Sequence, residues 1–168
     1  MRKYKKNMYV ENTLVLQNSV KIVENWKYFN NNIKKIYLSP NTEKIDDNAF
    51  RSNKLNNLIL PEKLNYVGKY AFADNNISTL NINSDSLVIK SCAFSDNKLK
   101  NLIIPSCIKI IEYGAFRNNS LESVIIPKSV EKIEEEAFKG NKLSNIKIPS
   151  ETVIHPNAFD KDVKIIRY

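Results

Sequence analysis

An Ala-Phe dipeptide recurs along the chain at an almost constant spacing. Its copies begin at alanines 22 residues apart, except for the last, which follows after 21. They begin at Ala49, Ala71, Ala93, Ala115, Ala137 and Ala158. A fixed period of roughly 20–50 residues is typical of a solenoid, in which each coil packs on its neighbours. The sequence therefore predicts stacked coils, whose positions are numbered 1–22 from the alanine.

Apolar residues occupy the same positions in successive repeats. Positions 10 and 12 are aliphatic, as in Leu58 and Leu60, and residues two apart on a strand point to the same side. Position 13 is often proline, which cannot donate to a ladder and turns the chain. We therefore expect one short parallel strand per coil and no long helix. The expected strands are centred on 14–16, 36–38, 58–60, 80–82, 102–104, 124–126 and 146–148.

Further positions complete the expected coil. Alanine at position 1 lets neighbouring coils approach. Phenylalanine at position 2 and the β-branched residue at position 19 supply apolar bulk for the wall opposite the strands. Asparagine at position 5 is expected to bond nearby backbone and to take left-handed dihedral angles at a corner. The phenylalanines should stack as a buried column. They are Phe50, Phe72, Phe94, Phe116 and Phe138.

The repeat A-F-x-x-N-x-L-x-x-[IVL]-x-I-P-x-x-[VI]-x-x-I resembles that of the BspA-like leucine-rich repeat family. The resemblance covers Leu14 to Tyr168, although asparagine stands at position 5, where the family often has cysteine. It implies a leucine-rich-repeat solenoid that is mainly β: a right-handed coil with one short parallel strand per 22-residue repeat and little helix. Because the family's members are mostly bacterial surface proteins implicated in adhesion, it also implies a protein-binding role.

The length of 168 residues suits a single domain. We expect an N-terminal cap over 1–13, repeats over 14–157 and a terminal half-repeat over 158–168. Charges before the first strand and on the last one predict blocked sheet edges, a finished stack and a monomer.

The coil around Asn83 departs from the pattern. Asn83 replaces proline, and polar Ser86 stands where other coils have an aliphatic residue at position 16. We expect the turn to shift so that Leu87 packs inward. The alternative is that Asn81 interrupts an apolar stripe to bond a partner.

The sequence offers little for catalysis. Cys92 and Cys107 lie at different corners of the repeat and are interpreted as unrelated thiols. His155, the only histidine, is interpreted as an exposed turn residue, and the carboxylates that follow Glu131 as solvated charge. Because metal-ligand spacings, phosphate-binding loops and nucleophile motifs are missing, we expect neither an enzyme nor a cofactor or metal site.

The outward side of the predicted strands is the candidate binding surface. Its position 11 is often aliphatic, which reflects either strand propensity or a binding stripe. Lysines at positions 8, 9 and 11 make this face basic, whereas positions 20–22 are mostly acidic. The candidate partner-binding residues on this concave face are Lys35, Tyr37, Ile59, Asn81, Ile103, Ile125, Lys147 and Arg167.

A basic face favours an anionic partner. Nucleic acid is disfavoured because only Tyr37 could stack a base, so protein or acidic glycan surfaces are preferred. No stretch is apolar enough to insert into a membrane, and no signal peptide is visible. Together with what the family resemblance implies, these features predict a non-enzymatic, adhesin-like binding module at the cell surface or secreted. The alternative is a cytoplasmic scaffold or a structural spacer without a specific ligand.

Overall fold

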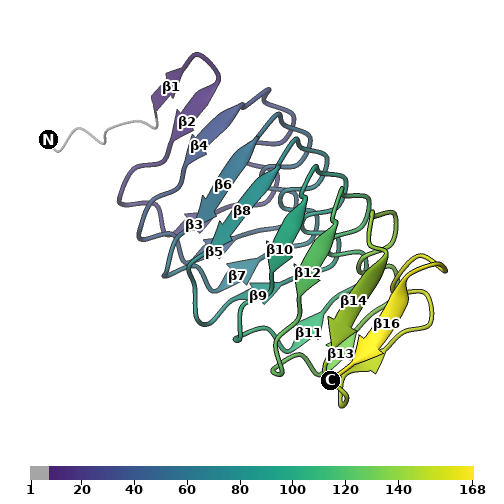
Figure 1. Ribbon diagram of the computed structural model, residues 1–168. Helices are drawn as coiled ribbons and strands as arrows, with labels where there is room; N and C mark the ends of the chain where they lie inside the picture. The colour runs from purple at the N-terminus through teal and green to yellow at the C-terminus, as the bar shows by residue number, and fades with distance from the viewer. Residues whose placement is uncertain (1–7) are drawn as a thin grey trace, which may run out of the picture.

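Strands occupy the positions that the repeat predicts. The computed structural model describes residues 8–168, and within this range the chain is a parallel β-solenoid without helix. A row of strands runs along one side of the molecule from the N-terminal to the C-terminal end (Figure 1). The row consists of β2 (Thr13–Val15), β4 (Lys35–Tyr37), β6 (Asn57–Leu60), β8 (Thr79–Ile82), β10 (Asn101–Ile103), β12 (Ser123–Ile125), β14 (Asn145–Ile148) and β16 (Lys164–Arg167). We call its outward surface the strand face.

Each coil also contains a second strand, which the sequence did not predict. These two-residue strands lie behind the first row around position 19 and form two parallel ladders, one over the first four strands and one over the last three (Figure 1). They are β3 (Ile22–Val23), β5 (Lys44–Ile45), β7 (Tyr66–Val67), β9 (Val88–Ile89), β11 (Ile110–Ile111), β13 (Lys132–Ile133) and β15 (Val153–Ile154). We call this row the rear ladder. Two residues are too few to give an alternating pattern, which explains why the sequence indicated only apolar bulk here.

Stacked aromatic rings fill the space between the two rows. The predicted phenylalanine column is confirmed: all five side chains are buried, and Tyr28 and Phe159 extend the column at its two ends. Successive ring centroids lie 5.3–5.7 Å apart with interplanar angles of 3–11°. This offset stacking ties each coil to the next through the middle of the core.

A column of buried asparagines holds the corner before each front strand. Asn97, for example, donates its amide to the carbonyls of Phe72 at 2.9 Å and Ser95 at 3.0 Å. Its Oδ1 accepts the backbone N–H of Ile77 at 2.9 Å. The predicted bonding to backbone is confirmed, and it joins two adjacent coils. Asn53, Asn75 and Asn119 repeat the arrangement.

The left-handed residues, by contrast, are not those expected. Positive φ angles occur at positions 4 and 22 of the coils, whereas Asn97 and the equivalent asparagines do not adopt them. Position 22 holds chemically unrelated residues such as Tyr70, Cys92 and Glu136. The prediction was wrong because the asparagine at position 5 serves as a hydrogen-bonding side chain and not as a turn residue.

Two parts of the stack depart from the regular repeat: the coil around Asn83 and the N-terminal end. In the exceptional coil Leu87 is buried and Ser86 exposed, which confirms the shifted turn. At the N-terminal end β1 (Met8–Val10) pairs antiparallel with β2, so backbone hydrogen bonds cover this edge. The cations that were expected to block it lie before residue 8, outside the described residues.

Candidate functional site

The strand face displays most of the residues predicted for partner binding. Tyr37, Ile59, Ile103 and Ile125 point outward from β4, β6, β10 and β12 with 49–68% of their surface exposed. Lys35, Asn81 and Lys147 are exposed on the same strands or their neighbours. The ammonium of Lys35 lies 4.7 Å from the ring centroid of Tyr37, in a cation–π contact.

Arg167 does not belong to this surface. The register of β16 pairs it with Ile148, whose side chain is buried, while Ile166 pairs with outward-facing Lys147. The Arg167 guanidinium donates to the carbonyls of Pro149 at 2.9 Å and Thr152 at 2.8 Å. The repeat numbering placed Arg167 at outward position 11, but its pairing with Ile148 puts it at position 12, because the last coil is shortened.

The row of front strands is interrupted at regular intervals. Within residues 8–168, three pairs of neighbouring front strands are not joined by a hydrogen-bonded ladder: β4 and β6, β8 and β10, and β12 and β14. At the first interruption lies a groove of about 690 Å³. Tyr37 and Ile59 line it together with Lys35, Pro40 and Pro61. Three predicted site residues therefore meet in one concave, largely apolar place with cations at its margin.

The second interruption carries a smaller groove. It measures about 420 Å³ and is lined by Asn81 and Ile103, with Asn83 and Pro105 among the others. Asn81, which pairs in register with Ile59, therefore lies within the row of outward apolar residues and shares a depression with Ile103. The strand face therefore contains two grooves, one at each of the first two interruptions.

The lysines on the front side of the solenoid differ from many other charged residues in forming no ion pairs within the described chain. All ion pairs among the described residues lie on the rear ladder and its flanking turns, as between Lys90 and Glu112 or Arg117 and Glu136. Positions 5–12 of the coils between 31 and 148 contain seven lysines and one carboxylate, Glu122. Within the described chain, none of these seven forms an ion pair.

Exposed apolar residues are not confined to the strand face. On the rear ladder, four side chains at position 18 are 46–64% exposed. They are Ile22, Val88, Ile110 and Val153. The sequence analysis missed this second stripe because it assigned no strand there. Apolar exposure therefore follows strand structure on both sides, and unpaired positive charge distinguishes the front.

The remaining candidate residues form no reactive centre. Cys92 and Cys107 are free thiols, as interpreted, and burial raises the pKa of Cys92. His155 is half-buried and not fully exposed as expected, and its Nδ1 accepts the backbone N–H of Asn157 at 3.2 Å. Glu136 accepts hydrogen bonds from Tyr113 and Lys139. Within the described residues, no group of three or more His, Cys, Asp or Glu side chains is placed to hold a metal ion.

Comparison with known proteins defines the class. The chain matches the BspA type leucine-rich repeat region over residues 6–100 and 87–166, with six copies, and it belongs to this family. No curated protein matches it significantly. Among the described residues, no helix is long and apolar enough to cross a lipid bilayer.

The solved structures that are similar to this chain are longer than it is. The pneumococcal vaccine antigen PcpA is similar with a TM-score of 0.69 and 17% identity, over 93% of this chain and 51% of that one. A leucine-rich cell surface protein from Faecalibacterium prausnitzii A2-165 gives 0.46 and 17%, over 91% and 59%. A leucine-rich repeat protein from Bacteroides ovatus ATCC 8483 gives 0.48 and 16%, over 94% and 54%. The chain thus spans about half the length of these proteins.

Proposed function

We propose that this repeat module is a non-catalytic, adhesin-like domain that binds a protein partner through its strand face. The observation that carries the proposal is the groove between β4 and β6. It combines exposed Tyr37 and Ile59 with the unpaired ammonium of Lys35. An aromatic and an aliphatic side chain around a concavity suit a partner's apolar anchor, and a rim of cations favours an acidic surface around that anchor.

Two findings support a place at the cell surface. The family resemblance implies surface proteins, and the structure with the TM-score of 0.69 is that of a bacterial vaccine antigen. A partner of such a domain is an extracellular protein of the host or of a neighbouring cell.

Binding to a panel of purified matrix and plasma proteins, measured by surface plasmon resonance, tests this proposal. Tyr37→Ala/Ile59→Ser should abolish the interaction. The matched control is Ile22→Ser/Val88→Ser, which removes a similarly exposed pair from the rear ladder and should leave binding unchanged. Equal losses in both variants would show that the exposed residues act only as strand formers, as in a structural spacer.

A further inference from the structure

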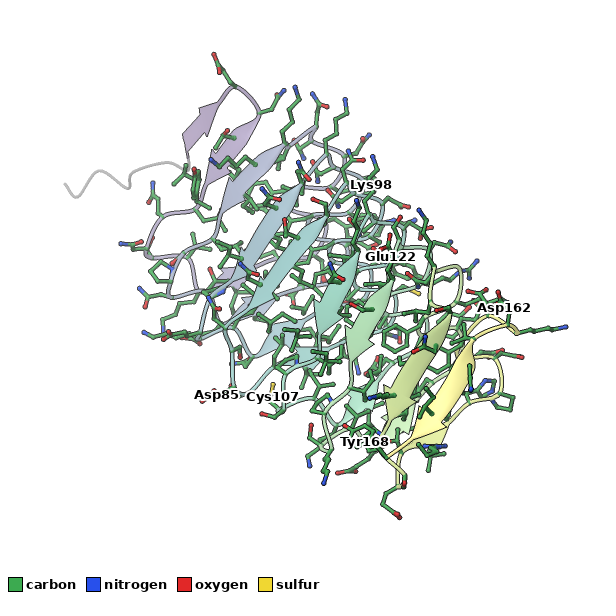
Figure 2. The ribbon with its side chains drawn as sticks, viewed as in Figure 1. Asp85, Lys98, Cys107, Glu122, Asp162 and Tyr168 are labelled. Atoms are coloured by element: carbon green, nitrogen blue, oxygen red, sulfur yellow. The ribbon has the colours of Figure 1, made fainter. Side chains whose placement is uncertain are left out.

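A second feature of the front side lies beside the strand face, where the chain enters the strands. Positions 6 and 8 carry exposed lysines there, and none of them is ion-paired within the described residues. We call these residues the basic ledge: Lys34, Lys54, Lys98, Lys100 and Lys142. Figure 2 labels Lys98 and Glu122 on this border, before β10 and β12.

Part of the basic ledge is a groove of about 480 Å³. It crosses four successive coils and is lined by Lys34, Lys54 and Lys98 with Asn56, Asn76 and Ser78. No carboxylate lines it. The Ser78 hydroxyl donates to Asn56 Oδ1 at 2.8 Å, so the amide nitrogen of Asn56 is left to donate elsewhere. The groove is therefore lined by hydrogen-bond donors, both lysine ammonium groups and asparagine amides.

Three of the five cations of the basic ledge are evenly spaced. Lys54, Lys98 and Lys142 each occupy position 6, in every second coil. Neighbouring strands lie about 4.8 Å apart, so these lysines recur about every 10 Å along the solenoid. Such a row matches a linear polymer with regularly repeated negative charges.

We propose that the basic ledge binds a linear acidic polysaccharide, bearing sulfate or uronate groups, that lies along the solenoid axis. Lysines supply point charges that tolerate varied anion geometry, while Asn56, Asn76 and Ser78 can bond sugar hydroxyls. The groove contains no aromatic side chain on which a nucleic acid base could stack. It also lacks the apolar pocket that anchors a peptide. Four of the six residues that line this groove, Lys54 and Lys98 among them, lie outside the protein-binding groove, which shares Lys34 and Asn56 with it.

The test uses size-defined heparin and polygalacturonate oligosaccharides, titrated into the protein by calorimetry at several salt concentrations. Lys54→Gln/Lys98→Gln should weaken binding by about tenfold or more and lower the salt dependence, since two charge contacts are lost. Lys69→Gln/Lys128→Gln removes two exposed lysines from other parts of the surface and should change affinity by less than about twofold. Thermal melting of both variants establishes that they are folded.

The outcomes separate the possible ligands. Binding of heparin alone would support a sulfated glycan, and binding of both oligosaccharides a wider range of acidic glycans. Tyr37→Ala/Ile59→Ser should bind both sugars normally, whatever happens to its protein partner. The proposal is overturned if wild type binds neither sugar, or if both lysine variants lose affinity equally. It is also overturned if polyglutamate or single-stranded DNA binds as tightly as the sugars.

Discussion

The asparagine at position 5 shows how one side chain can connect two coils. Asn97 is buried, and its amide donates to carbonyls of both its own coil and the preceding one, while its oxygen accepts from Ile77. Asn97→Ala leaves these groups without partners, and we expect a loss of at least about 2 kcal/mol in the free energy of unfolding. Chemical denaturation measures this loss.

Asn97→Asp serves as the matched variant. A charged carboxylate cannot donate to the carbonyls that surround it, so burial should raise its pKa in the folded state. When folding raises the pKa of a group, the folded state loses stability as pH rises through the raised pKa. The variant should therefore be closer to wild type at pH 4 than at pH 7. An equal deficit at both pH values would contradict this account of the asparagine.

Glu136 should affect stability with the opposite pH dependence to that of the Asn97→Asp variant. Hydrogen bonds from Lys139 and Tyr113, together with the charge of Arg117, hold the pKa of its carboxyl below the ordinary 4.5. A carboxyl whose pKa is lowered by folding stabilises the folded state at pH values above its ordinary pKa. This stabilisation is lost as pH falls through the lowered pKa. Glu136→Gln should therefore be less stable than wild type at pH 6, and the difference should shrink below about pH 4. Glu151→Gln, at an exposed position, is the charge-matched control for the denaturation curves.

At the scale of elements, the aromatic column makes stability depend on neighbours. Phe94 is buried and stacks on Phe72 and Phe116, at 5.4 and 5.7 Å, whereas Phe159 stacks on Phe138 alone among the described rings. Phe94→Ala should cost about 3–5 kcal/mol, as for other buried phenylalanines. Phe159→Ala should cost clearly less, because a terminal coil has one neighbour. Equal losses on urea denaturation would count against nearest-neighbour coupling.

The sequence predicted the elements that recur with a strong chemical signature. Phenylalanine at position 2 and paired aliphatics at positions 10 and 12 located the core and the front strands. The rear ladder was missed because a two-residue strand leaves no periodic trace. The interruptions after β4, β8 and β12 were missed for another reason: they depend on hydrogen-bonding distances between coils whose sequences look alike.

For the candidate site, the sequence predicted which face most residues lie on, but not which of them share a groove. Tyr37 and Ile59 could be placed on one face from the period of two along a strand, but not in a shared groove. Arg167 was misplaced because the shortened final coil changes the register by one residue, and such a slip turns a side chain to the other face. The basic ledge required knowledge of which lysines form ion pairs, and this follows only from three-dimensional contacts.

At the scale of the whole molecule, charge is sorted around the solenoid axis. Anions of the rear turns neutralise nearby cations in short pairs, as between Lys132 and Glu134 at 3.1 Å. The front keeps its lysines unpaired within the described residues, so one side carries most of the uncompensated charge. Two copies approaching front to front would repel each other, and this repulsion weakens as salt is added. Self-association through the strand face is therefore opposed at low salt.

A second route to self-association is the edge of β16, which in the described chain pairs with β14 alone. Lys164 lies on this strand, and charged residues on an edge discourage pairing with another chain. We expect a monomer by light scattering at all accessible concentrations. Lys164→Val should produce concentration-dependent association, because it gives the edge an uncharged, β-branched residue. Lys161→Val, which makes the same change outside the strand, should stay monomeric. A wild-type dimer formed through the acidic rear turns would refute both the edge argument and the charge argument.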